Sequence, residues 1–93
     1  MSAQAVGRVW ERSTYSGARL VVLLAVADVV NDTYDHRFWM TVAELAKKAR
    51  TSENTARSAM QAFVEDGWLE VVEGSRGRRP NEYRFTAPDV TPQ

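Results

Sequence analysis

Residues 41–67, TVAELAKKARTSENTARSAMQAFVEDG, predict two short helices joined by a tight turn. The first helix begins with a capping box. In it, the Thr41 hydroxyl accepts a hydrogen bond from the amide of Glu44, and the Glu44 carboxylate accepts one from the amide of Thr41. The second helix begins after Ser52, a favourable N-cap residue, and runs to about Asp66. Because the turn between them is short, the two helices are expected to be neighbours in space.

The second of these helices has one apolar and one polar face. Its apolar residues recur at helical spacing and are expected to face the core: Ala56, Ala59, Met60, Phe63 and Val64. The opposite face carries the hydrogen-bonding side chains of Asn54, Ser58 and Gln61, with Arg57 on the flank. Gly67 is expected to end the helix. The outer face near the start of the helix therefore combines hydrogen-bonding groups with little charge repulsion.

Alternating apolar and polar residues on either side of this helix pair predict three strands. Residues 37–40 precede the pair, and residues 68–73 and 81–85 follow it as the two arms of a hairpin. The strand at 37–40 has no neighbour in sequence, so it must pair with one of the later strands. Residues 74–80 connect the hairpin arms and contain three arginines, Arg76, Arg78 and Arg79.

A long helix is expected from about residue 16 to residue 31, after a short amphipathic helix marked by Val6, Val9 and Trp10. The long helix carries two apolar stripes. One comprises Leu20, Leu23, Leu24, Ala27 and Val30, and the other comprises Val22, Val26 and Val29. The second stripe needs a cover, which either the N-terminal segment or a second copy of the chain would supply. The large aromatic residues Trp10, Trp39 and Trp68 and the three phenylalanines are expected in the core.

The order helix, strand, helix, turn, helix, hairpin over residues 16–85 resembles the winged helix-turn-helix modules of actinobacterial, plasmid and phage regulators and replication initiators. The segments that carry the resemblance are 38–41, 45–46, 52–57, 67–71 and 76–85. It implies an α+β fold, in which a three-helix core with an N-terminal helical segment joins a small antiparallel sheet ending in a β-hairpin wing. This sequence departs from the family at a turn position often held by glycine, which here is Arg50. The turn is therefore expected either to pack less tightly or to need a strained backbone.

The resemblance divides the chain into three parts. Residues 1–14 form an N-terminal helical extension, residues 15–86 form the winged helix-turn-helix domain, and residues 87–93 form a flexible tail. A chain of 93 residues is the size of one domain.

Composition narrows the classes of function. No apolar stretch reaches the roughly 18 residues of a membrane-spanning helix. The absence of cysteine excludes disulfides, thiolate zinc sites and a cysteine nucleophile. The single histidine, His36, has no second histidine with which to bind a metal, and we expect neither an enzyme nor a cofactor. Residues 1–12 do not have the pattern of a signal peptide, so a cytoplasmic, nucleoid-associated protein is expected.

Charge is balanced in total, with 12 basic and 12 acidic residues, but it is segregated along the chain. Residues 47–57 contain four basic residues and one acid, and residues 74–85 contain four arginines and one acid. Acidic stretches lie between and before them. This distribution predicts a cationic surface on one side of the molecule, which suits a polyanionic partner such as double-stranded DNA.

These observations assign DNA contacts to three groups of residues. Base edges in the major groove would be read by Asn54, Arg57, Ser58 and Gln61, because asparagine and glutamine pair with adenine and arginine with guanine. Phosphates would be held by Lys47, Lys48, Arg50, Ser52 and Thr55. The minor groove would receive the wing arginines Arg76, Arg78 and Arg79.

The expected function is sequence-specific binding of double-stranded DNA, as a transcriptional repressor or other regulator that occupies an operator. Two alternatives remain open: an accessory DNA-binding role in phage or plasmid replication, partition or excision, and a winged-helix module that binds proteins. A homodimer is expected through Val22, Val26 and Val29 or through the N-terminal segment. No membrane contact and no small-molecule ligand are expected.

Overall fold

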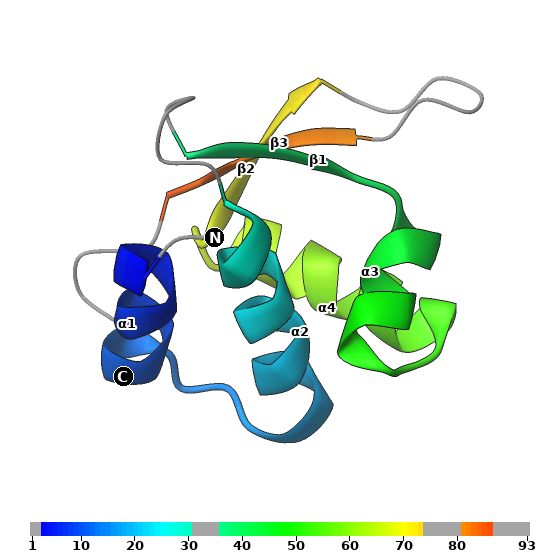
Figure 1. Cartoon of the computed structure of the whole chain (residues 1–93), viewed down its shortest axis with the longest axis horizontal. Coiled ribbons are helices and arrows are strands. Elements are labelled where there is room, and N and C mark those ends of the chain that lie inside the picture. Colours follow the sequence, from blue (N-terminus) through cyan, green and yellow to red (C-terminus); the bar gives the residue numbers. More distant parts are fainter. Residues whose placement is uncertain (1–2, 31–35, 74–80, 87–93) are drawn as a thin grey trace.

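The computed structural model describes residues 3–30, 36–73 and 81–86. Within these ranges the chain has an α+β fold, which confirms the predicted class (Figure 1). The helices are α1 (Ala3–Arg12), α2 (Gly17–Val29), α3 (Val42–Ala49) and α4 (Glu53–Glu65). The strands are β1 (Arg37–Met40), β2 (Leu69–Glu73) and β3 (Asn81–Phe85). Each expected helix and strand is therefore present, with ends within a few residues of the prediction.

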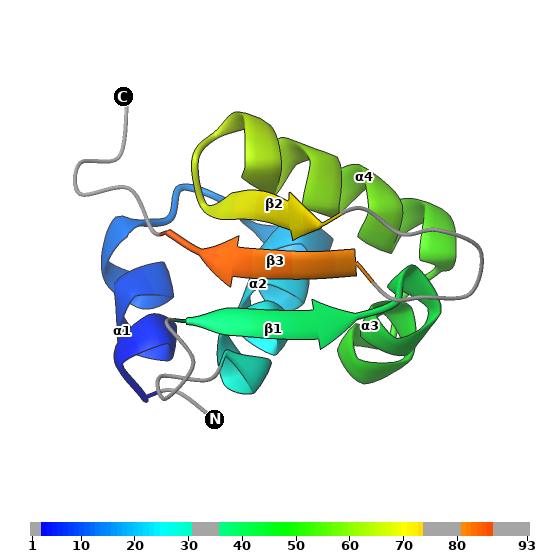
Figure 2. The ribbon, with the colours of Figure 1, turned by 90° about the horizontal axis from the view of Figure 1, so that it is seen from above.

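The three strands form one antiparallel sheet in the order β1-β3-β2. The strand at 37–40 thus finds its partner in β3, where Phe38 lies opposite Tyr83. β2 pairs with the other edge of β3, and a bulge interrupts its register between Val71 and Glu73. Figure 2 shows the sheet lying over the helices, with β2 nearest α4.

Because the helices cover one face of the sheet, successive residues along a strand alternate between buried and exposed positions. Phe38 and Tyr83 point inward, are buried and stack with their ring centroids 5.4 Å apart. Trp39, the next residue along β1, points to the uncovered face and is 51% exposed. The expectation of a core position for Trp39 was therefore wrong, because Phe38 occupies the inward position of that strand.

Trp10 is the second tryptophan that the sequence placed wrongly in the core. In α1 the core positions go to Ala5 and Val9, which join the same buried cluster as the other helices. Trp10 follows Val9 by one residue, which turns its side chain about 100° away from the core, and it is 63% exposed. Trp68 and the phenylalanines are buried, as predicted.

α2 is the central helix, because it packs against α1, α3 and α4. This position buries most of both apolar stripes, including Val22 at 1% and Val26 at 0% exposure, while Leu20, Leu24 and Val29 are half-buried. The stripe of Val22, Val26 and Val29 is thus covered by the chain itself. It does not provide the dimer surface that the sequence suggested.

The connection between α1 and α2 is tied to the far end of α4. The Tyr15 ring packs against Phe63, with centroids 5.2 Å apart, and its hydroxyl donates to the carboxylate of Asp66. Burial, the hydrogen bond to Asp66 and the negative charge of that carboxylate together raise the pKa of Tyr15 above its ordinary value. These contacts join the two halves of the helical layer.

The two helices of the 41–67 segment begin with the predicted caps. At α3, the Thr41 hydroxyl accepts from the Glu44 amide at 3.1 Å and Glu44 accepts from the Thr41 amide at 3.1 Å. At α4, the Ser52 hydroxyl accepts from the amide of Thr55 at 3.1 Å. Both helix starts are therefore determined by contacts over three residues.

The two helices also end alike. After α3 the chain turns through a left-handed residue, Arg50 (φ 58°, ψ 48°), and the Thr51 amide donates back to the Ala46 carbonyl at 3.0 Å. After α4, Gly67 takes the same role (φ 88°), and the Trp68 amide donates to the Phe63 carbonyl at 2.8 Å. Both ends are Schellman motifs. The strained backbone predicted at Arg50 is confirmed, because a residue with a Cβ atom occupies the left-handed region.

Candidate nucleic-acid interface

The polar face of α4 presents all four residues that the sequence assigned to base reading. Asn54, Arg57, Ser58 and Gln61 are each exposed, whereas Ala56, Ala59, Met60 and Phe63 on the opposite face are buried. From Asn54 to Gln61 the helix rises about 10 Å, which matches the length of about three stacked base pairs. The exposed stripe is therefore long enough to span about three base pairs.

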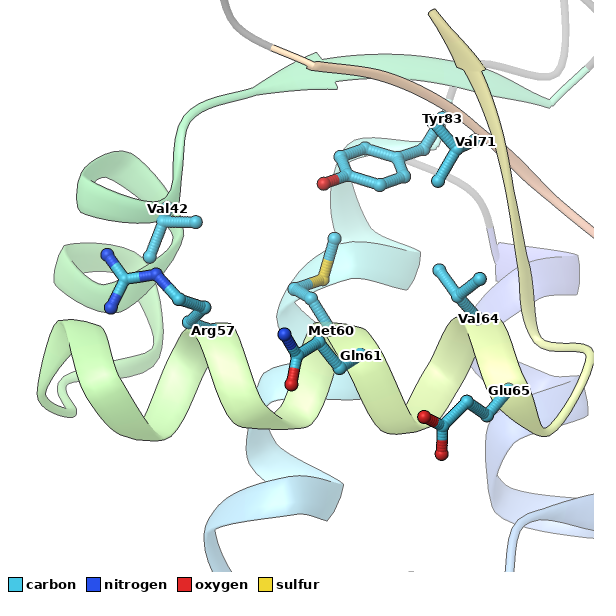
Figure 3. Close-up of a pocket in the computed structure, with 8 residues that line it drawn as sticks. All are labelled: Val42, Arg57, Met60, Gln61, Val64, Glu65, Val71 and Tyr83. Atoms are coloured by element: carbon cyan, nitrogen blue, oxygen red, sulfur yellow. The ribbon is translucent and has the colours of Figure 1, made fainter. Parts of the chain in front are cut away.

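Two of these side chains are already held together. Arg57 Nη1 donates to Asn54 Oδ1 at 3.1 Å, one helical turn apart. Since Asn54 accepts through Oδ1, the two donors of its amide nitrogen are not used in this pair. Figure 3 shows that the Arg57 side chain also reaches across toward Val42 of α3 rather than straight away from α4. The Asn54–Arg57 pair thus forms an ordered donor array at the start of α4.

The hydroxyls at the start of α4 are engaged within the chain. Besides accepting from the Thr55 amide, the Ser52 hydroxyl donates to the Thr55 hydroxyl at 2.9 Å. Ser52 and Thr55 were expected to contact phosphate. In this arrangement their first role is to cap the helix, and a phosphate would share these hydroxyls with the cap.

The two lysines at the end of α3 differ in their surroundings. Lys48 Nζ lies 2.8 Å from a carboxylate oxygen of Asp28 on α2, and this hydrogen bond lowers the pKa of Asp28 below its ordinary value. Lys47 is exposed and forms no hydrogen bond or ion pair with the residues that the structure describes. The sequence treated the two lysines as equivalent, but only Lys47 has its ammonium group unengaged.

Arg50 extends this basic surface into the turn. It is exposed, and its left-handed backbone places it between the last residues of α3 and the first of α4. Lys47, Arg50 and Arg57 therefore lie on one segment, the end of α3 and the first turns of α4. The predicted wing arginines Arg76, Arg78 and Arg79 lie outside the described residues, as does the 87–93 tail.

The outer face of the sheet has a different charge pattern. Arg37 Nη1 lies 3.2 Å from Glu82, and Arg84 Nη1 lies 4.0 Å from Glu70. Both of these arginines are thus matched by a carboxylate from a neighbouring strand. This pairing leaves the α3–α4 segment as the more cationic of the two surfaces.

A groove of about 590 Å³ runs alongside the polar face of α4 (Figure 3). It is lined by Val42, Arg57, Met60, Gln61, Val64, Glu65, Val71 and Tyr83. Val64 is 37% exposed, so its predicted burial was wrong. Val64 and Val71 of β2 both line the groove, and the space between α4 and β2 leaves Val64 partly uncovered. The sequence did not reveal the groove, because its walls come from α3, α4, β2 and β3.

The described ranges contain no cluster of three metal-ligating side chains. Nor does any helix in the part of the chain that the structure covers have both the length and the apolarity needed to cross a membrane. No family model, curated protein or solved structure matches this chain.

Proposed function

We propose that this protein binds double-stranded DNA sequence-specifically, with α3, the turn at Arg50 and α4 acting as a helix-turn-helix and residues 74–80 as a wing. The observation that carries the proposal is the polar stripe from Asn54 to Gln61, exposed along α4 directly beside the basic end of α3. A helix whose polar face only contacts solvent has no need of a cluster of basic residues beside that face. A polar stripe flanked by cations suits recognition of bases between two phosphate backbones.

In this arrangement α4 enters the major groove. Arg57 donates to a guanine edge, and Asn54 and Gln61 pair with adenine or with neighbouring base edges, while Ser58 contributes a hydroxyl. Arg57 does not have to break an ion pair in order to contact a base, because its hydrogen-bond partner is the neutral Asn54. Base contacts by these side chains would supply specificity.

Lys47 and Arg50 supply the phosphate contacts of the proposal, with Ser52 and Thr55 at the helix start. Lys48 has a smaller part, because its ion pair with Asp28 turns it toward α2. Phosphate contacts fix the register of the protein on the duplex without reading sequence. In this proposal the domain catalyses no reaction. It acts as a repressor that occupies an operator.

The first experiment selects a pool of random duplexes on the purified full chain at moderate salt, and then sequences the retained DNA. A sequence motif is expected. Arg57→Ala should relax preference at one position of the motif and cost about 1–3 kcal/mol on the best site. Glu65→Ala, two turns further along the exposed face of α4, is the matched control and should leave the motif unchanged.

A loss from Arg57→Ala that is equal on every sequence would contradict its role as a base reader. An unenriched pool would contradict sequence-specific binding altogether. It would favour a protein-binding module, for which the apolar groove beside α4 is the observation in its support.

The two lysines of α3 test the phosphate contacts. Lys47→Ala should weaken binding to all sequences and reduce the slope of log affinity against log salt by about 1. Lys48→Ala, one residue away, should change the slope much less, because this lysine already pairs with Asp28 at 2.8 Å. An unchanged slope in Lys47→Ala would show that the end of α3 does not face the DNA backbone. Equal reductions in both variants would show that the ion pair with Asp28 does not keep Lys48 from phosphate.

A further inference from the structure

The hydrogen bond of Arg57 differs from the pairing that the sequence of α4 favours. Glu53 is four residues before Arg57, and an acid and a base at this spacing on a helix attract each other. Within the described residues, however, Arg57 makes no ion pair, and its guanidinium donates to the neutral Asn54 at 3.1 Å. The side chain is therefore held in place without neutralisation of its charge.

Two neighbours limit where the Arg57 side chain lies. Asn54, one turn earlier on α4, holds Nη1. Figure 3 shows the side chain reaching toward Val42 at the start of α3, and both residues line the same groove. An arginine in solvent samples many rotamers, and ordering it on binding costs conformational entropy. A guanidinium that is already held in the free protein loses less entropy when it contacts a base.

The hydrogen bond with Asn54 leaves Arg57 able to read guanine. An arginine side chain has five N–H donors, and this bond uses one of them, on Nη1. Bidentate pairing with guanine needs two donors, directed at O6 and N7. In the part of the chain that the structure describes, Nη2 and Nε donate to no other group, so their donors remain for that contact.

Direct reading of adenine by Asn54 would use the oxygen that Arg57 already occupies. Bidentate pairing of asparagine with adenine needs the side-chain oxygen as acceptor and the amide nitrogen as donor. Here Oδ1 accepts from a charged guanidinium, which forms a stronger hydrogen bond than a neutral donor such as the adenine amino group. The oxygen therefore favours Arg57 over adenine.

We infer that Asn54 is a positioning residue for Arg57 and that it acts on the choice of base through Arg57, so that both side chains specify a single guanine. The inference rests on the proposed function, because it concerns the same polar stripe of α4. It replaces a separate contact of Asn54 with adenine by the orientation of the neighbouring guanidinium. Gln61, the other exposed amide of the stripe, has no hydrogen bond to Arg57 among the described residues and keeps its own base contact.

The selection from random duplexes, repeated with two amide variants, tests this assignment. Asn54→Ala should relax the motif at the same position as Arg57→Ala. It should lower the preference for that guanine about three- to tenfold, the range for the loss of one hydrogen bond. Gln61→Ala is the matched control, because it removes an amide from the same stripe, and it should relax a different position and leave the guanine preference unchanged.

A chain that carries both Asn54→Ala and Arg57→Ala provides a second comparison. It should bind the selected duplex within about twofold of Arg57→Ala alone, because Asn54 then has no guanidinium to hold. Losses that multiply would show that Asn54 reads a base of its own, and would overturn the inference. Matching circular dichroism spectra would establish that the variants are folded.

The free protein provides a readout that needs no DNA. Nitrogen relaxation of the Arg57 Nε–H group reports how firmly the side chain is held on the picosecond-to-nanosecond timescale. The order parameter should be high in the wild type and in Gln61→Ala, and it should fall in Asn54→Ala. A side chain that is as mobile in the wild type as in Asn54→Ala would overturn the inference, because Asn54 would then hold nothing in place.

Two results of the selection separate this inference from the proposed function. A wild-type motif in which Asn54→Ala relaxes a different position from Arg57→Ala would overturn the positioning role and leave sequence-specific DNA binding intact. An unenriched wild-type pool would overturn both.

Discussion

The two ends of the helical layer, α1–α2 and α3–α4, share one core but differ in what they leave exposed. Both bury small and branched apolar residues in the same cluster. The α3–α4 end exposes hydrogen-bonding and basic groups such as Asn54, Arg57 and Lys47, whereas the α1–α2 end exposes Trp10 and Val21. The side chains outside the core therefore distinguish the two ends: the exposed groups named are polar or basic at the α3–α4 end and apolar at the α1–α2 end.

The largest effect should come from breaking the core that the two ends share. Phe63 of α4 is fully buried and packs against Tyr15, which precedes α2. Phe63→Ala should cost about 3–5 kcal/mol of unfolding free energy, because it removes a buried ring and leaves a cavity. Urea unfolding followed by circular dichroism and by tryptophan fluorescence measures it.

One transition, shifted equally in both signals, is expected for Phe63→Ala. Val64→Ala, at the adjacent 37% exposed position, should cost much less. Two separate transitions would show that the α1–α2 and α3–α4 ends unfold independently, contrary to a single core.

A smaller effect should be confined to the α3–α4 end. Ser52→Ala removes the hydroxyl that accepts from the Thr55 amide and should cost about 1 kcal/mol of unfolding free energy. Ser58→Ala makes the same change on the exposed middle of α4 and should have almost no effect or stabilise slightly. Thermal melts of the two variants make the comparison, and equal losses would contradict the assignment of Ser52 as the cap.

The turn in the α3–α4 end should gain stability when its strain is relieved. Arg50→Gly should raise the unfolding free energy by up to about 1 kcal/mol, because glycine takes the left-handed conformation without a Cβ clash. Gly67→Ala, at the equivalent position after α4, should lower it by a similar amount. Denaturant midpoints measure both, and a loss of stability in Arg50→Gly would mean that its side chain makes contacts worth more than the strain.

The smallest effect concerns the ion pair that connects the two ends. Lys48 of α3 holds the pKa of Asp28 in α2 below its ordinary value, so the folded state favours the ionised carboxylate. The stabilisation is present above the pKa of the unfolded chain, near 4, and is lost as the pH falls through the lower folded value. A carbon-detected NMR titration should show this low pKa, and Lys48→Met should restore it to the ordinary range. An unchanged pKa in Lys48→Met would assign the shift to another group.

Local chemistry made much of the fold predictable. The caps at Thr41 and Ser52, the stop at Gly67 and the left-handed Arg50 all depend on hydrogen bonds that span six residues or fewer. The polar face of α4 follows from helical spacing alone, which is why the exposure of Asn54, Arg57, Ser58 and Gln61 could be anticipated. Their role in DNA binding stays a prediction.

The sequence by itself determined where α3 and α4 begin and end, because their caps and C-terminal turns are hydrogen bonds between residues a few positions apart. Only the tertiary structure decided which apolar side chains are covered, since cover comes from elements distant in the chain. Val22 and Val26 are buried because three helices surround α2, while Trp10 and Trp39, equally apolar, face outward. The difference between Lys47 and Lys48 was decided in the same way, by an aspartate twenty residues before Lys48 that reaches only one of them.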